Sequence, residues 1–209
     1  MEAGRALMPG CVRAAAAETF MKIYKIVAFT LLSSLGPAAQ AADTYQIDPV
    51  HASVLFKARH LNIADVYGRF DDVSGTVTLD PANAADDSIN LEIKADSLDT
   101  HNEKRDQQIK GPDFLNVKQF PTITFRSTKV EKAGDDTYDV TGNLTLRGVT
   151  KPLTLQFKKT GEGKGMKDEY RAGGETQFTI RRGDFGMTFI PNVVGEDVTL
   201  IISLEGIKK

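Results

Sequence analysis

SLDTHNEKRDQQIKGPDFLNVKQFPTITF, residues 97–125, lies between two groups of alternating segments and contains the only part of the chain after residue 41 that is predicted as helix. Thr100 and Glu103 have the spacing of a capping box, in which each side chain accepts a hydrogen bond from the other's backbone amide. Gly111 and the proline after it predict the helix end, with the glycine in a left-handed cap. Between these ends only Ile109 is aliphatic, so we expect a polar helix that contacts the protein along one edge.

The residues that follow this helix are apolar and include Phe114, Leu115, Val117 and Phe120. A polar helix and an aromatic-rich turn, set between two groups of strands, favour a lid over an opening. A plain connector between two sheets would produce the same pattern, so both interpretations stay open at this stage.

About eight segments alternate between apolar and polar residues with a period of two, which is typical of strands with one buried face. They lie near residues 53–59, 73–80, 89–95, 123–125, 138–146, 153–157, 178–180 and 198–205. One-sided strands joined by short connections predict antiparallel neighbours. The pattern therefore predicts an all-β fold, either an up-and-down barrel or a sandwich. The apolar faces match a single interior and not a lipid-facing band.

The N-terminal 41 residues are expected to lie outside this fold. Residues 21–41 combine a short basic head, an apolar run and the small residues that a signal peptidase reads, which predicts a secretory signal peptide. The run has about ten residues, where a membrane-spanning helix needs roughly twenty. Cleavage is expected after Ala41, with Ala42 as the alternative, and residues 1–20 are interpreted as an upstream extension. Residues 43–209 then form a single domain.

Composition excludes several classes of function. Cys11 is the only cysteine, so the chain after residue 41 has no disulfide, thiol nucleophile or lipid-anchor cysteine. That part carries 22 Lys and Arg against 26 Asp and Glu, a net charge of about −4. A mildly acidic protein is, by its net charge, a poor partner for nucleic acid and for anionic membrane surfaces, so we expect no nucleic-acid binding.

The sequence offers little catalytic or metal chemistry. The three histidines, His51, His60 and His101, lack the spacing of a metal site, and acidic doublets such as Asp71-Asp72 lie beside predicted turns. No serine lies in a nucleophile elbow. We therefore expect no catalytic residues, no bound metal and no enzymatic activity.

Two places could still meet the polar end of a ligand. The segment Arg181–Gly186 (RRGDFG) sets two cations and a carboxylate beside a phenylalanine, a combination that suits a barrel mouth that meets a polar head group. Solvated charges at an exposed strand end are the alternative. Together with the first turn of the predicted helix, this gives three candidate head-group contacts: His101, Arg182 and Asp184.

Four segments together resemble the YceI-like family: YQIDPVHASVLFKARH (45–60), residues 102–125 with NEKRD and PDFLNVKQFPTITF, GNLTLRGVTKPLTL (142–155) and FTIRRGDFGM (178–187). Their order and spacing match throughout residues 44–207. The resemblance implies an extended, lipocalin-like, eight-stranded antiparallel β-barrel with a short helical insertion around residues 100–117. It also implies export to the periplasm and binding of a long apolar molecule, such as a polyisoprenoid, an isoprenoid quinone or a fatty amide. A functional link to a cytochrome b-type membrane protein follows from the same resemblance, which supplies no catalytic residues.

An eight-stranded barrel is wide enough either to be filled by its own side chains or to hold one slender ligand. The predicted inward faces mix large residues with small ones such as Gly142, which leaves room. Strands of about ten residues span roughly 33 Å, so the space would suit a long chain. We expect these residues to line or close the cavity: Phe56, Leu91, Ile93, Phe114, Phe125, Leu144, Leu155, Phe178, Phe185, Leu200 and Ile202.

The functional hypothesis is a secreted periplasmic carrier of a long-chain lipid, with that lipid as its ligand and no other cofactor. We expect no membrane-spanning segment, although transient membrane contact is compatible with such a cargo. Either a monomer or a homodimer fits the sequence. The alternative is a structural or envelope-stress protein with a filled barrel that works through its outer surface.

Overall fold

The computed structural model describes residues 42–80, 83 and 86–209. The predicted upstream extension (1–20) and signal peptide (21–41), with the expected cleavage site at Ala41, lie outside the described residues. Ala42 directly precedes the first strand. Within the described part of the chain, no helix is both long and apolar enough to cross a membrane.

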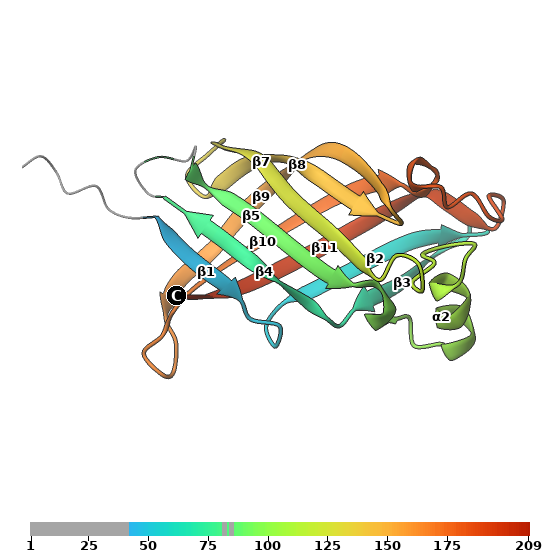
Figure 1. The fold of residues 1–209 in the computed structure, drawn as a ribbon, viewed down its shortest axis with the longest axis horizontal. Coiled ribbons are helices and arrows are strands. Elements are labelled where there is room, and N and C mark those ends of the chain that lie inside the picture. The colour runs from blue at the N-terminus through green and yellow to red at the C-terminus, as the bar shows by residue number, and fades with distance from the viewer. Residues whose placement is uncertain (1–41, 81–82, 84–85) are drawn as a thin grey trace, which may run out of the picture. The chain divides into compact units, whose positions relative to one another are not determined.

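The described residues form eleven strands, one α-helix and two short 3₁₀ turns (Figure 1). In chain order they are β1 (Asp43–Ile47), β2 (Ser53–His60), β3 (Ala64–Phe70), β4 (Val73–Leu79), β5 (Ser88–Lys94), η2 (Ala95–Ser97), β6 (Leu98–Asp99), α2 (Glu103–Lys110), β7 (Thr122–Lys132), β8 (Thr137–Leu146), β9 (Val149–Lys164), β10 (Tyr170–Arg181), η3 (Arg182–Phe185) and β11 (Val194–Lys208).

Eight of these strands form a closed antiparallel ring in the order β1-β4-β5-β7-β8-β9-β10-β11. The ring closes where β1 pairs with the end of β11, with Tyr45 opposite Lys208. The prediction of an eight-stranded antiparallel barrel is therefore confirmed, and the sandwich is wrong. A connector between two sheets is also wrong, because the strands on both sides of α2 belong to one sheet.

One edge of β11 is shared by two strands. Residues 206–208 pair with β1, whereas residues 194–203 pair with β2. The β2–β3 hairpin therefore extends the wall at the end of the barrel where β11 begins, and the two-residue strand β6 pairs with β3. Helix α2 lies at this same end (Figure 1).

The barrel wall holds phenylalanine rings against glycines of neighbouring strands. A β-carbon added at Gly68 would lie 2.4 Å from Cζ of Phe56, and one at Gly142 would lie 2.5 Å from Cζ of Phe125. Each ring therefore covers a glycine, and a side chain there would push the ring inward. This arrangement holds bulky side chains against the wall and leaves the centre of the barrel free.

The start of α2 differs from the predicted capping box. Asn102 is the N-cap, and its side chain accepts a hydrogen bond of 3.0 Å from the backbone amide of Arg105. The Thr100 hydroxyl instead donates to Asp106 and accepts a 2.8 Å hydrogen bond from Nε of Arg105. The predicted left-handed cap at Gly111 is also wrong, because its backbone is extended.

Candidate functional site

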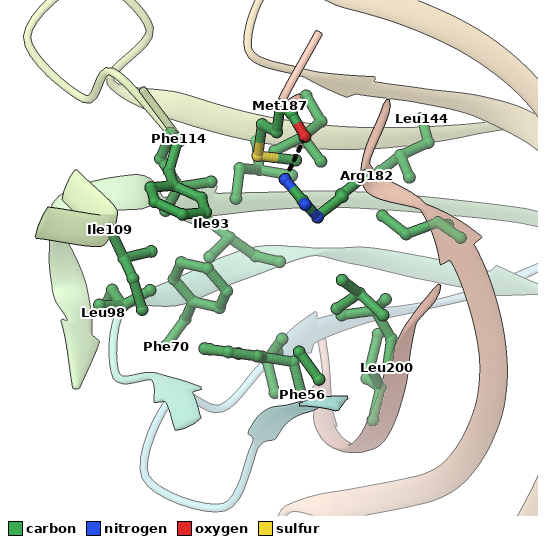
Figure 2. Close-up of a pocket in the computed structure, with 18 of the residues that line it drawn as sticks. Phe56, Phe70, Ile93, Leu98, Ile109, Phe114, Leu144, Arg182, Met187 and Leu200 are labelled. Carbon is green, nitrogen blue, oxygen red and sulfur yellow. Dashed lines mark hydrogen bonds between the residues drawn. The ribbon is translucent and has the colours of Figure 1, made fainter. Parts of the chain in front are cut away.

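The barrel contains an apolar cavity of about 410 Å³ (Figure 2). Its wall comes from inward-facing residues of β2, β3, β5 and β7 to β11, because each strand places alternate side chains on the inner face. That volume is far above the roughly 10–15 Å³ that one water molecule needs, so it leaves space for a chain of carbon atoms. The shape of the site therefore favours one slender apolar ligand.

The structure brings together ten of the eleven residues that the sequence predicts for the cavity. The ten that line it are Phe56, Leu91, Ile93, Phe114, Phe125, Leu144, Leu155, Phe178, Leu200 and Ile202. Phe185 does not line the cavity; it lies in η3 and is buried in the surrounding core. Contact of any of these residues with a ligand stays a prediction.

Part of the wall is apolar but is not covered by other protein atoms. Phe178 on β10 lies opposite Leu200 on β11, which lies opposite Phe56 on β2. All three line the cavity and are only half-buried, although they face the inside of the barrel. The neighbouring row Ile180–Val198–Ala58 has the same property. Uncovered apolar surface inside a barrel costs free energy in water, and an apolar ligand would remove that cost.

Helix α2 borders the end of the cavity near β2 and β3. Its Ile109 is half-buried and lines the cavity beside Phe114 and Leu98 (Figure 2). The polar lining lies at this end and includes Lys104, Arg105 and Gln108 of α2 with Arg59 and His60 of β2. The helix therefore lies at the opening as a lid would, with one apolar side chain pointing inward.

The three candidate head-group contacts lie in different places. His101 is exposed over 83% of its side chain and lines the outer side of α2, where its Nδ1 is 3.6 Å from a carboxylate oxygen of Asp99. Asp184 is also exposed and is not part of the cavity wall. Only Arg182 lines the cavity.

Arg182 is buried, with 2% of its surface exposed. Its Nε donates to the carbonyl oxygen of Gly195 over 3.0 Å, one Nη donates to that of Val194 over 2.8 Å, and the other donates to that of Met187 (Figure 2). The guanidinium therefore holds together the loop that joins η3 to β11. One Nη also lies 3.9 Å from Oε1 of Glu196, so the positive charge has a carboxylate partner.

Sequence reasoning missed the polar residues at the mouth. Lys104, Arg105 and Gln108 belong to a helix that looks solvated on all sides, and Arg59 and His60 end a strand. Their position follows from the β2–β3 extension of the wall, which no local pattern reveals.

The opposite end of the barrel carries a charged cluster. Nη1 of Arg171 donates to Asp48 over 2.9 Å and also to Glu205, and Nδ1 of His51 lies 2.8 Å from Oδ2 of Asp48. The contacts with His51 and Arg171 lower the pKa of Asp48 to about 2. Asp48, His51 and Glu205 could each offer a ligand atom to a metal, but the guanidinium already binds both carboxylates. The cluster therefore acts as an ion-pair clamp between β10, β11 and the segment after β1.

The chain resembles known proteins over most of its length. The family profile of the YceI-like domain matches residues 45–206. A UPF0312 protein of Pectobacterium atrosepticum is 40% identical over 187 residues, which cover 90% of this chain and 97% of that relative.

Two solved structures share the fold. The YceI protein of Campylobacter jejuni has a TM-score of 0.65 at 32% identity, and the alignment covers 72% of this chain and 90% of that one. A polyisoprenoid-binding domain from Saccharophagus degradans, implicated in plant cell wall breakdown, has a TM-score of 0.63 at 17% identity, covering 79% and 98%. The second likeness is one of fold alone.

Proposed function

Since the chain belongs to the YceI-like family, we propose that it is a carrier protein that holds a long-chain apolar lipid inside its barrel. The cargo class is a polyisoprenoid, an isoprenoid quinone or a fatty amide. A neighbour in fold is named as a polyisoprenoid-binding domain, which supports the first of these three.

One observation carries the proposal: the barrel contains about 410 Å³ of space, and part of its apolar lining, on β2, β10 and β11, is only half-buried. Burying ten methylene groups there would contribute roughly 8 kcal/mol before the cost of association. Binding would then depend mainly on chain length and shape, so selectivity among long chains should be weak. The same space counts against the alternative of a filled barrel that works only through its outer surface.

The lining favours binding over catalysis. The deep wall consists mainly of aliphatic and phenylalanine side chains, whereas the titratable residues of the lining lie at the mouth or, in the case of Arg182, donate to backbone carbonyls. General acid–base catalysis needs a titratable side chain next to the reacting atom of a substrate, and the apolar chain of a lipid offers no such reacting atom.

We place the protein in the periplasm after removal of residues 1–41. The signal-peptide pattern at residues 21–41 supports this location. Exchange of cargo with a cytochrome b-type membrane protein belongs to the same proposal, whereas an envelope-stress role through the outer surface belongs to the filled-barrel alternative.

The test is native mass spectrometry of the protein isolated from its own cells, followed by solvent extraction and lipid analysis. The expected result is a bound species of several hundred daltons that extracts as an isoprenoid or acyl lipid. A protein of bare mass that also fails to take up added ubiquinone would contradict the proposal.

A matched pair of variants links the bound lipid to the cavity. Ala58→Phe adds a ring to the half-exposed inner row and should reduce ubiquinone uptake strongly. Ser53→Phe adds a ring on the outer, exposed side of the same strand and should leave uptake unchanged. Equal uptake by both variants would mean that the lipid binds elsewhere.

A further inference from the structure

Two loops with exposed apolar side chains lie side by side at the end of the barrel where β11 begins. They are the β2–β3 turn (residues 61–63) and the loop of residues 186–193, which we call the rim loops. The backbone amide of Leu61 donates to the carbonyl of Val193 over 2.7 Å. Ile63 is 77% exposed, Leu61 47% and Phe189 40%.

The rim loops form the edge of the cavity mouth. His60, Ile190 and Val193 line the cavity directly. The ring of Phe189 packs edge-on against Phe114, another lining residue, with 5.9 Å between ring centroids. In Figure 1 the tip of the β2–β3 hairpin, the loop before β11 and α2 lie together at one end of the barrel.

Charge is distributed unevenly around this mouth. Residues 61–64 (LNIA) and 186–195 (GMTFIPNVVG) contain no charged residue, whereas 26% of the whole chain is charged. Just behind them, the charged residues of the cavity lining are all cations: Arg59, Lys104, Arg105 and Arg182. Arg59 is paired with Asp65 and Arg182 with Glu196, which leaves Lys104 and Arg105 of α2 as the cations of the lining that form no ion pair with a carboxylate among the described residues.

The backbone of the rim loops is strained. Leu61, Asn62 and Ile190 have φ angles of 49°, 60° and 43°, in the left-handed region. Such angles cost free energy for a leucine and more for a β-branched isoleucine. Glycine or asparagine would relax positions 61 and 190 as asparagine already does at position 62, so the backbone conformation does not account for the exposed leucine at position 61.

We infer that the rim loops dock on the surface of a lipid bilayer, with Leu61, Ile63 and Phe189 inserted among the lipids and the exposed Lys104 of α2 near anionic head groups. This inference rests on the proposed function: with the rim loops on the bilayer, the apolar chain of a lipid could pass between the bilayer and the barrel without crossing water. Uncharged apolar loop tips backed by cations match an anionic membrane surface. Their continuity with the mouth places the cavity entrance against the membrane.

The test is sedimentation of the purified protein with vesicles of phosphatidylethanolamine and phosphatidylglycerol. The double variant Leu61→Asn/Ile63→Ser should weaken vesicle partitioning at least tenfold, and Phe189→Ser should weaken it by about tenfold. Asparagine tolerates the left-handed backbone at position 61, so the fold is retained. Neutral phosphatidylcholine vesicles should bind the unchanged protein more weakly than anionic ones.

The matched control is Val50→Ser/Met166→Ser. These side chains are 81% and 104% exposed and lie at the opposite end of the barrel, beside Asp48 and in the β9–β10 turn. The control should bind vesicles as the unchanged protein does. Equal loss in both double variants, or no loss in the rim variants, would overturn the inference.

A second readout separates the inference from the proposed function. Ubiquinone uptake from a vesicle-free dispersion should be the same for Leu61→Asn/Ile63→Ser as for the unchanged protein. Uptake without any vesicle binding would refute membrane docking and leave the carrier function standing. Vesicle binding without uptake would refute the carrier function alone. If the rim variants abolish only self-association or binding of another protein, the rim is a protein interface and the inference is wrong.

Discussion

Replacement of the buried Arg182 by methionine should destabilise the protein by about 3–5 kcal/mol. The guanidinium is 2% exposed and donates to the carbonyl oxygens of Met187, Val194 and Gly195. Methionine fills a similar volume but donates nothing, so three carbonyls lose a charged donor. An acceptor left buried without a partner costs about 1–3 kcal/mol, less where water can reach it. The midpoint of thermal unfolding should fall by about 10 °C.

The assay is urea unfolding of the unchanged protein, Arg182→Met and Arg181→Met. Arg181 is the exposed neighbour in the chain, so its substitution should change the free energy of unfolding by less than about 0.5 kcal/mol. Arg182→Lys should lie in between, because one ammonium group cannot reach all three carbonyls. A loss below about 1 kcal/mol for Arg182→Met, with no difference from Arg181→Met, would refute the assignment of Arg182 as the residue that holds the loop.

Three further predictions concern the wall, the lid and the far end of the barrel. Gly68→Ala places a β-carbon 2.4 Å from Cζ of Phe56, so it should lower stability by about 1–3 kcal/mol and reduce ubiquinone uptake, whereas Gly161→Ala, with nothing within 4 Å, should change neither. Thr100→Val removes the hydroxyl that bonds to α2, so amide hydrogen exchange of residues 103–110 should become faster while that of β8 stays the same. Because the folded-state pKa of Asp48 is lowered to about 2, its contribution to stability is full above about pH 4 and is lost as pH falls toward 2. In Asp48→Asn, the free energy of unfolding measured in urea should therefore change less between about pH 4 and pH 2 than in the unchanged protein. An unchanged pH dependence would contradict the role of Asp48 in the ion-pair clamp.

The barrel and most of its inner wall could be predicted because strand alternation is a local signal. Leu144, Leu155 and Leu200 follow a period of two, and an antiparallel ring turns that period directly into an inner face. Phe185 was expected to line or close the cavity, but it lies in η3, outside any alternation of apolar and polar residues. Three of the described strands were not predicted: β1 has only five residues, Gly68 interrupts the apolar face of β3, and β6 has only two residues.

Neither the residue that caps α2 nor the residues at the cavity mouth could be predicted from the sequence, for different reasons. Thr100 and Asn102 both suit an N-cap, and the choice depends on Asp106 and Arg105 binding the Thr100 hydroxyl. Isolated turn residues such as Ile63 carry no periodicity, so their place at the mouth depends on the register of β2 with β11. Register across such a long separation in sequence is a tertiary property.

The pairing of the first strand with the last has a consequence for folding kinetics. Tyr45 and Lys208 become neighbours only when almost the whole chain has been ordered, so the relative contact order is high and folding should be slow. Until β11 is in place, the edges of β1, β2 and β10 are all unpaired, because all three bond to that one strand. A nascent chain that lacks its last dozen residues therefore exposes open edges prone to aggregation, and it needs either speed or a chaperone to reach the closed ring.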